Sequence, residues 1–435
     1  MDITGRKLFV KALQEEGVDT IFGYPGGTVT DLFDELYKQD EIEIVLPRHE
    51  QGLLHEAEGY AKSTGKVGVC LVTSGPGATN IMTGLADAHY DNIPLVCFTG
   101  QVPLNLIGND AFQEVDIVGM TRSITKYGVT VRDRKDLGKI IKMAFHIAST
   151  GKPGPVLIDL PKDIQTASGP AEYPDSVQIR GYKPNESVHI GQLKKAYKLL
   201  KSAKKPLILA GGGVNIAKAN ELLKEFAEKM NVPVVTTIMG KGAIVTTHPL
   251  YIGNTGMHGK YASNKAVSEC DVLFSIGTRF NDRITGDLNE FAPKAKIVHI
   301  DVDTASISRN VVVDVPIVSD AKLALEKLLE WGGTRRKVAL LSVSGLALLM
   351  SMLGMEPLPF EVSWIAIVLC GVPVVLEAVL GLATAWDIKA GVLVSIALIA
   401  SVIIGEDFAA GEVAFIMQLG ELLEELTVAR ARKGI

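Results

Sequence analysis

The chain has 435 residues, enough for two to four domains at roughly 100 to 200 residues each. Its formal net charge of −5 and its pI near 6.0 argue against the basic surface that nucleic acid requires. Its four cysteines lie far apart without a Cys-x-x-Cys pair, which indicates reduced thiols in a cytosolic setting. The charged N-terminal segment lacks the apolar core of a signal peptide.

Short apolar runs alternate with helical patterns over residues 1–165. The runs include TIFG, KVGVCLVTS and IPLVCFTG, and helical periodicity fills the segments between them, for example from His49 to Ser63. Strands that alternate with helices in this way join through right-handed crossovers into a parallel sheet that is covered on both faces. The pattern therefore predicts a doubly wound α/β domain.

A second α/β domain is predicted over residues 188–331. A polar stretch with proline and glycine, from Gln165 to Ser187, is typical of a linker. The alternation then resumes through KKPLILAGGGV, VPVVTTI, CDVLFSIGTRF and AKIVHIDVD, and it ends in a helix from Ala321 to Trp331. We expect a second parallel sheet.

Charged residues almost vanish after Val338, and the tail holds four apolar segments. A membrane-spanning helix needs about 20 apolar residues, and about 17 suffice. The positive clusters RRK and RARK flank the tail, as expected if both of its ends face the cytoplasm. We predict a four-helix transmembrane segment over residues 338–435, and hence a multi-pass membrane protein with cytoplasmic amino-terminal domains. A buried helical core is the alternative. The predicted spans are Val338 to Met355, Val362 to Trp386, Ile388 to Ile404 and Phe408 to Leu423.

The stretch PRHEQGLLHEAEGYAKSTGKVGVCLVTSGPGATN places Glu50 at the start of a helix, just after a strand. Open α/β sheets bind ligands at the carboxyl ends of their strands. The glycine-containing turns GYPGG and SGPGATN fall at the same edge and let the backbone approach a ligand closely. Glu50 is therefore a candidate catalytic residue, although a glutamate at a helix start can also act only on the helix dipole.

Several motifs resemble, in order and spacing, the large catalytic subunit of acetolactate synthase (acetohydroxyacid synthase), a thiamine-diphosphate enzyme. They are YPGG, RHEQG, TSGPGATN, IPLVCFTGQVP, IGNDAFQEVDIVGMTRSITK and GPVLIDLPKDIQ, and the resemblance covers residues 1–331. It implies that residues 1–165 bind the cofactor's pyrimidine and that Glu50 contacts its N1′ atom. A carboxyl group there relays the proton that activates the thiazolium carbon.

The resemblance also assigns residues around Glu50. It implies that Gly75 and Gly77 contact the cofactor, and it places four residues on the substrate side: Gly26, Phe112, Gln113 and Lys162. The alternatives for these four are a turn glycine, a core aromatic, a surface amide and a solvated lysine.

The second domain resembles the family's FAD-binding middle domain through AGGG, GMHG, GTRFNDRITG, HIDVD and SD. Glycines admit a pyrophosphate, and arginines offer it planar donors. Lys152 stands where the family often has an arginine that contacts FAD, which implies weaker flavin binding because lysine lacks the bidentate fork. The implied FAD-binding residues are Gly211, Gly212, Gly213, Met257, His258, Gly259, Arg279, Arg283, Asp301 and Asp320.

The Gly-Asp-Gly motif with which this family holds Mg²⁺ beside the diphosphate does not occur in the chain. We therefore predict that the metal ligands are absent and that only the pyrimidine half of the site is present. From about Val338 the resemblance changes to the first membrane helices of a heavy-metal P-type ATPase, without the pump's DKTGT motif.

The sequence thus predicts an acetolactate synthase-like hybrid. The implied reaction condenses two 2-oxo acids, such as pyruvate, with loss of CO₂ in branched-chain amino-acid biosynthesis. We expect the chain to be truncated and inactive alone, and to form a homo-oligomer or pair with a complete subunit. The alternatives are a membrane-tethered flavin-binding hybrid without catalysis and a remnant of a metal-transporting ATPase.

Overall fold

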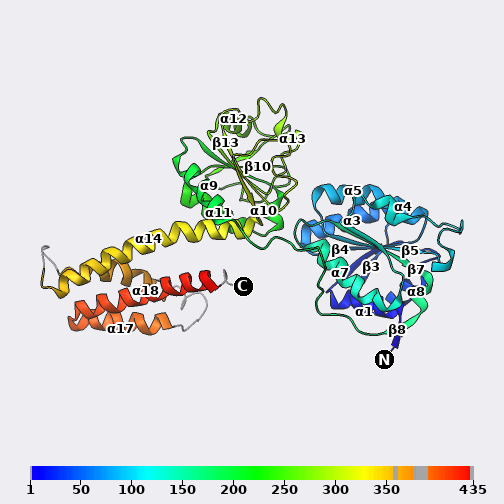
Figure 1. Ribbon diagram of the computed structural model, residues 1–435, viewed down its shortest axis with the longest axis horizontal. Coiled ribbons are helices and arrows are strands. Elements are labelled where there is room, and N and C mark those ends of the chain that lie inside the picture. Colours follow the sequence, from blue (N-terminus) through cyan, green and yellow to red (C-terminus); the bar gives the residue numbers. More distant parts are fainter. Residues whose placement is uncertain (1, 356–360, 377, 379–389, 432–435) are drawn as a thin grey trace. The chain divides into compact units, whose positions relative to one another are not determined.

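The computed structural model describes residues 2–355, 361–376, 378 and 390–431. It divides into two compact units, Met1–Ala324 and Leu325–Ile435. The first unit contains two six-stranded parallel sheets, each with its own helices (Figure 1). These two α/β domains agree with the sequence prediction.

The sheet of the amino-terminal domain has the strand order β3-β2-β4-β5-β7-β6. Each neighbouring pair is parallel. The order reverses between β2 and β4, so the carboxyl ends of these two strands form the kind of edge at which open sheets bind ligands. The strands are β2 Thr20–Gly23, β3 Glu43–Val45, β4 Gly68–Val72, β5 Leu95–Gln101, β6 Tyr127–Thr130 and β7 Pro155–Pro161.

Helices cover both faces of this sheet, because successive side chains of a strand point to opposite faces. Val69 and Leu71 of β4 enter one core, which includes α1 and α7 residues, whereas Cys70 and Val72 enter the other, beside α3 and α5. The same two layers are visible in Figure 1. The helices are α1 Gly5–Glu15, α2 Thr30–Leu36, α3 Glu50–Thr64, α4 Pro76–Asn80, α5 Met82–Asp91, α6 Ile117–Thr121, α7 Leu137–Ser149 and α8 Lys162–Thr166, with short 3₁₀ turns η1 Leu104–Leu106 and η2 Arg134–Asp136.

The predicted linker begins inside the last helix of this domain. After α8 the chain forms β8 Ser168–Pro170, which pairs antiparallel with β1 Asp2–Thr4. The guanidinium of Arg134 donates a hydrogen bond to the carbonyl oxygen of Ile3 at 2.9 Å, and this contact fixes the added pair to the domain. The chain then has no regular element until α9, Ile190–Ser202.

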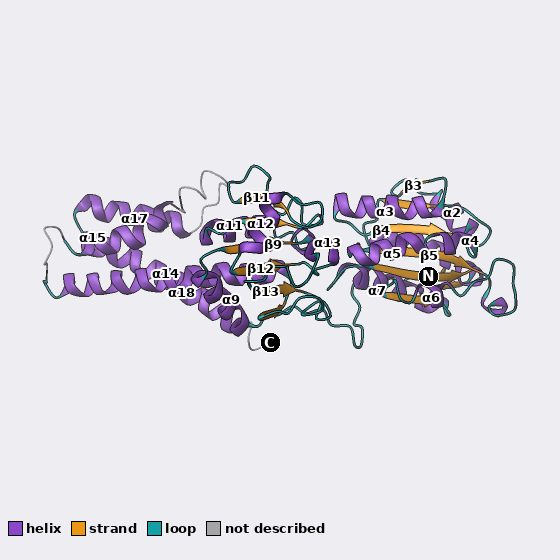
Figure 2. Cartoon of the chain, turned by 90° about the horizontal axis from the view of Figure 1, so that it is seen from above, coloured by secondary structure: helices purple, strands orange, loops and turns teal. Residues whose placement is uncertain are grey.

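The central domain repeats the architecture with the strand order β11-β10-β9-β12-β13-β14. Its strands lie side by side between helices in Figure 2. Leu207 and Leu209 of β9 pack with Leu273 of β12 in the core on one face. The strands are β9 Pro206–Ala210, β10 Val234–Thr236, β11 Tyr251–Asn254, β12 Val272–Ile276, β13 Lys296–Asp301 and β14 Val315–Val318; the helices are α10 Gly212–Ile216, α11 Asn220–Met230, α12 Tyr261–Glu269 and α13 Asp282–Thr285.

The second unit is helical. Its helices share a small core that contains Leu341, Ile367, Leu398 and Ala414. Trp364 Nε1 donates a hydrogen bond to the Asp407 carboxylate at 2.8 Å, which joins two helix starts. The elements are α14 Ala321–Met352, α15 Ser363–Ala366 with the π-helical turn η3 Ile367–Gly371, α17 Ala390–Ile404 and α18 Asp407–Ala431.

The predicted four-helix transmembrane segment is wrong, and the multi-pass membrane localisation falls with it. Among the described residues, no helix is both long enough and apolar enough to cross a bilayer. The second predicted span runs through residues 377 and 379–386, and the third begins at 388–389; these positions lie outside the described residues.

The lengths and the charged residues of the helices explain the error. α17 has 15 residues, or roughly 22 Å at about 1.5 Å per residue, against a hydrocarbon core of about 30 Å. Gly354 and Gly405 follow the ends of α14 and α17 in the left-handed conformation, with φ of +67° and +88°. Glycines there end a helix with a left-handed cap. The longer α14 begins with charged residues, and α18 carries acidic residues throughout.

Candidate functional site

The carboxyl group of Glu50 lies at the edge where the order of strands reverses. Glu50 is the first residue of α3, and its Oε2 atom accepts a hydrogen bond from Nδ2 of Asn80 at 3.0 Å. Asn80 is the last residue of α4, which follows the carboxyl end of β4. The side-chain amide fixes one carboxylate oxygen, so the other is oriented as well.

Two glycine turns pack closely against the side chain of Thr73, beside this carboxylate. A Cβ atom on Gly77 would lie 3.4 Å from Glu50 Oε1 and 2.8 Å from Thr73 Cγ2. A Cβ atom on Gly26 would lie 2.5 Å from Thr73 Cβ. Thr73 is in turn hydrogen-bonded through its hydroxyl to the hydroxyl of Thr28 at 3.0 Å. A side chain at either glycine would therefore displace Thr73, and one at Gly77 would also contact the Glu50 carboxylate.

A third segment reaches the same edge. Gly75 has φ of +57°, and a Cβ atom there would lie 2.8 Å from both Cβ and the carbonyl oxygen of Gln113. Gln113 itself has φ of +57°, so both residues adopt the left-handed region. Phe112 is 86% exposed and belongs to no core, so the core-aromatic alternative does not describe it.

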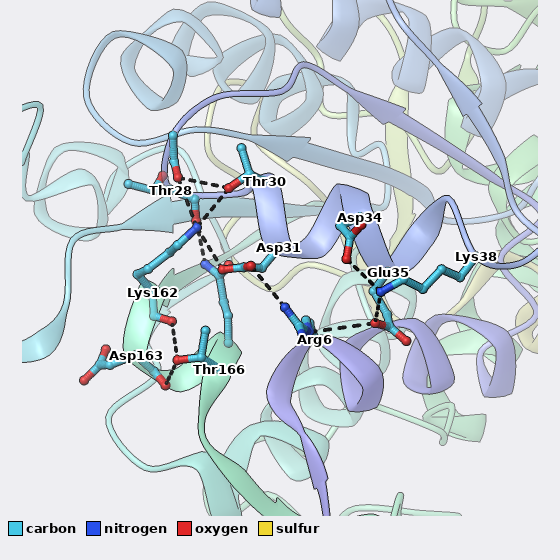
Figure 3. Close-up of polar contacts among 12 residues, drawn as sticks. Arg6, Thr28, Thr30, Asp31, Asp34, Glu35, Lys38, Lys162, Asp163 and Thr166 are labelled. Carbon is cyan, nitrogen blue, oxygen red and sulfur yellow. Dashed lines mark hydrogen bonds and ion pairs between the residues drawn. The ribbon is translucent and has the colours of Figure 1, made fainter.

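Lys162 points toward Thr30 and Asp31 at the start of α2 (Figure 3). Its Nζ atom donates to the Gly27 carbonyl oxygen at 3.1 Å and to Thr30 Oγ1 at 3.0 Å. It also pairs with the carboxylate of Asp31 at 2.9 Å, and its hydrogen bond holds the pKa of Asp31 below its ordinary value. Lys162 therefore anchors the turn that carries Gly26.

A cavity of about 680 Å³ in the first unit collects many residues that the resemblance assigns to a flavin. Tyr90 and Gly151 of the amino-terminal domain complete its wall. Asn281 lies in the wall with a buried Oδ1 atom that has no hydrogen-bond partner. A buried oxygen in this state can accept a hydrogen bond from a ligand. The assigned residues in the wall are Lys152, Gly212, Gly213, Arg279, Arg283, Asp301 and Asp320.

Glycines bring the ends of β9 and β12 into backbone contact at this cavity. A Cβ atom on Gly211 would lie 2.1 Å from the Gly277 carbonyl oxygen, and one on Gly213 would lie 2.7 Å from Gly277 Cα. The Gly213 amide donates to that same carbonyl oxygen at 3.1 Å. No side chain fits between the two turns, so the floor of the cavity is made of backbone.

Charged side chains surround this floor. The guanidinium of Arg279 lies 5.6 Å from the ring centroid of Tyr90, a cation–π contact. The Lys152 ammonium pairs with the Asp303 carboxylate at 2.7 Å. Cationic groups at a glycine-rich floor suit a ligand that carries phosphates.

The GMHG residues lie elsewhere. Met257, His258 and Gly259 form a turn after β11 and are not among the residues that line the larger cavity. Met257 lines a smaller hollow of about 390 Å³, and its amide donates to the Arg283 carbonyl oxygen at 2.8 Å. Arg283 lines both hollows, so it connects them.

Sequence reasoning missed four residues that the structure brings to these sites: Thr73, Asn80, Tyr90 and Asn281. Thr73 and Asn80 belong to the quoted motif TSGPGATN, and Asn281 belongs to GTRFNDRITG, so their positions in those motifs were available as a signal. Tyr90 meets Arg279 across two domains, and no local pattern indicates such a pair.

Two family models match the chain. Residues 3–120 match the N-terminal TPP binding domain of thiamine pyrophosphate enzymes, and residues 193–328 match their central domain. Over these two domains the chain belongs to the thiamine pyrophosphate enzyme family.

Curated relatives make the family more specific. A probable acetolactate synthase large subunit of Methanococcus aeolicus is 52% identical over 331 residues, which are 75% of this chain and 55% of that protein. The acetolactate synthase large subunit of Haemophilus influenzae is 48% identical over 75% of this chain and 57% of its own length. The acetolactate synthase isozyme 3 large subunit of Escherichia coli is 47% identical over 75% of this chain and 58% of its own length. The two domains are thus acetolactate synthase large-subunit-like.

The chain spans a little over half the length of these relatives. The family models end at residue 328, and the comparisons do not support the resemblance of residues 338–435 to a P-type ATPase. The comparisons therefore also give no support to the two alternatives, a membrane-tethered flavin-binding hybrid and a remnant of a metal-transporting ATPase.

Proposed function

We propose that the chain takes part in the thiamine-diphosphate-dependent condensation of two 2-oxo acids, pyruvate among them, with loss of CO₂. The observation that carries this proposal is the oriented carboxylate of Glu50 beside the glycine turns of Gly77 and Gly26, where a larger residue would collide with Thr73. Thiamine diphosphate supplies an electron sink for such a reaction when it is bound.

The proposed role of Glu50 is to hold a proton at N1′ of the cofactor's pyrimidine. Asn80 donates to Oε2 and so keeps Oε1 turned toward Gly77. Lys162 holds the turn of Gly26 in place, and it is a positioning residue in this scheme. Phe112 and Gln113 follow at the same edge, where we place the substrate side, whereas Gly75, which packs against Gln113, contacts the cofactor in this scheme.

We further propose that the 680 Å³ cavity holds FAD. Its backbone floor suits the pyrophosphate, Arg279 and Arg283 supply donors, and the free oxygen of Asn281 supplies an acceptor. Asp301 and Asp320 can accept hydrogen bonds from hydroxyl groups. Lys152 is engaged by Asp303, which agrees with the weaker flavin binding that its identity predicts.

Titration of the full chain with FAD tests this part. We expect saturable binding that shifts the flavin absorption, and weaker binding in Arg279→Met. The matched control is Arg122→Met, an exposed arginine of the amino-terminal domain. Absence of saturable binding would remove the flavin proposal and leave the thiamine proposal standing. Flavin binding without any contribution to turnover would favour a non-catalytic flavin module.

The chain's inactivity on its own stays a prediction. It depends on the Gly-Asp-Gly motif, which is not found in the 435 residues, and on the Mg²⁺ that this motif holds in the family. Incubation of the full chain with pyruvate, thiamine diphosphate and Mg²⁺ tests it. Formation of acetolactate by the chain alone would contradict it.

Complementation tests the proposed role of Glu50, and it tests the pairing with a complete subunit that we infer. The chain is co-expressed with the Methanococcus aeolicus large subunit in which the glutamate that aligns with Glu50 is changed to glutamine. We expect the mixed complex to form acetolactate, because this chain supplies the missing carboxylate. Glu50→Gln should abolish the rescue, whereas Glu56→Gln, an exposed residue of the same helix, should preserve it.

A mixed complex that forms but produces no acetolactate would contradict the proposed role of Glu50. If no mixed complex forms, the inferred pairing is wrong, and self-association of this chain is the arrangement left to test.

A further inference from the structure

A second group of potential ligands lies on the outer helices of the amino-terminal domain. Among the described residues, His55, Glu58 and Asp87 bring one ligand atom each to within 4.8 Å of one another. His55 and Glu58 are one turn apart on α3, and Asp87 belongs to the neighbouring α5. His55 Nδ1 lies 2.8 Å from Glu58 Oε2 and 3.9 Å from Asp87 Oδ2. The thiamine and flavin proposals use none of the three.

The state of Glu58 sets this group apart from an ordinary surface ion pair. The residue is only 4% exposed, and its Oε1 atom is buried without a hydrogen-bond partner. Burial raises the pKa of Glu58, and the charge of Asp87 raises it further, while the contact with His55 opposes both. A buried carboxylate oxygen without a donor is costly, and a cation removes that cost.

The donor set indicates the kind of cation. One imidazole nitrogen with two carboxylates is a ligand set that suits zinc and its first-row neighbours, whereas Ca²⁺ and Mg²⁺ prefer oxygen ligands alone. Two ligands at about 2.0–2.2 Å from a tetrahedral ion lie roughly 3.3 Å apart. The two distances from His55 lie on either side of that value, so small movements of side chains suffice.

We propose that His55, Glu58 and Asp87 form a binding site for a divalent transition-metal ion such as Zn²⁺. The carboxylate of Glu58 can use both of its oxygens, including the one that has no partner. Three protein ligands leave a position for water. His55 and Asp87 are half exposed, so the ion can reach the site from solvent.

The ion would fasten α3 to α5. The first residue of α3 is Glu50, and α5 begins two residues after Asn80, to which Glu50 is hydrogen-bonded. The proposed metal site therefore joins α3, which carries Glu50, to the helix that follows Asn80, and it uses neither of these two residues.

Spectroscopic titration with Co²⁺ tests the site without any assay of activity. The full chain is freed of metal with a chelator, and Co²⁺ alone is added while the visible absorption is recorded. We expect the bands of a tetrahedral or five-coordinate ion, saturating at one equivalent and abolished by Zn²⁺. Zn²⁺ alone should also raise the melting temperature, because it binds the folded state.

Three single variants locate the ion. His55→Gln and Asp87→Asn change exposed side chains and should preserve the far-UV circular dichroism spectrum, but each should weaken Co²⁺ binding by at least about tenfold. Glu56→Gln removes a neighbouring exposed carboxylate and should bind as the unmodified chain does. A lack of saturable binding, or unchanged affinity in both His55→Gln and Asp87→Asn, would overturn the proposal.

Discussion

Asp159 lies on β7, between β5 and β6 of the amino-terminal sheet, and is 2% exposed. Three side chains donate hydrogen bonds to its carboxylate: Thr99 at 2.8 Å, Thr130 at 3.0 Å and Gln101 at 3.2 Å. Burial nevertheless raises the pKa of Asp159 to about 6, because the three donors offset only part of the loss of water. The quoted motif GPVLIDLPKDIQ contains Asp159 but does not indicate its contacts, since the donors come from two other strands, β5 and β6.

Asp159 predicts a dependence of stability on pH. The folded pKa near 6 exceeds the value of 3.8 for an ordinary aspartate, so the folded state binds more protons in this range. The stabilisation is complete below about pH 4 and is lost as the pH rises through 6, by up to roughly 3 kcal/mol.

Urea unfolding followed by far-UV circular dichroism at pH 4.5 to 7.5 measures this effect. The stability of the unmodified chain relative to Asp159→Asn should fall across that range, because asparagine has no proton to lose. A constant difference between the two proteins would contradict the raised pKa.

At the scale of elements, the contacts of Lys162 predict that α8 steadies the start of α2. Lys162→Met should speed amide exchange over residues 26–36 and destabilise the domain by about 1–2 kcal/mol, because hydrogen bonds to a charged donor are lost. Hydrogen–deuterium exchange with mass spectrometry measures the first effect. The control is Lys38→Met, since exposed Lys38 pairs with Asp34 at the other end of the same helix and should alter exchange little.

The backbone contact between the ends of β9 and β12 predicts that Gly211 does not tolerate a side chain. Gly211→Ala forces the Gly277 turn away and should destabilise the central domain by at least about 1–3 kcal/mol. Gly59→Ala, inside α3 with open space around it, should instead stabilise the chain by about 0.5–1 kcal/mol. Thermal unfolding by circular dichroism compares the two, and a harmless Gly211→Ala would show that the turns can separate.

The sequence was sufficient for the two sheets because their strands are apolar runs with buried residues on both faces, bounded by glycine turns. The sequence did not predict where the helix that follows the second sheet ends. A helix from Ala321 to Trp331 and a separate span from Val338 were expected, yet α14 continues to Met352. Gly332 and Gly333 weaken a helix without ending it, so composition alone did not locate the boundary.

For the whole molecule, the helical unit shows why hydropathy misled. Apolar side chains at helical spacing remain exposed on α14, including Val343, Leu346 and Leu349. On α17 the corresponding residues are Leu393, Ile396 and Ile399. A sequence window counts these residues with the buried ones and cannot detect that α17 ends too early to span a bilayer.

These two stripes predict self-association, because contiguous exposed apolar surface is removed from water by a second copy. The double variant Leu346→Gln/Ile396→Gln should lower the sedimentation coefficient at micromolar concentration toward that of a single chain. Val312→Gln, at an 86% exposed apolar residue of the first unit, is the control and should leave it unchanged. A monomeric unmodified chain would exclude this behaviour.

The four cysteines have a practical consequence. Each thiol is buried and unpaired: Cys70 and Cys97 lie in the amino-terminal sheet, Cys270 in the central domain and Cys370 among the helices. Each of these folded parts thus contains a native thiol that reacts with an alkylating reagent only after that part opens. Pulses of a thiol reagent, read out by peptide mass, would time the opening of each part separately without introducing a single label.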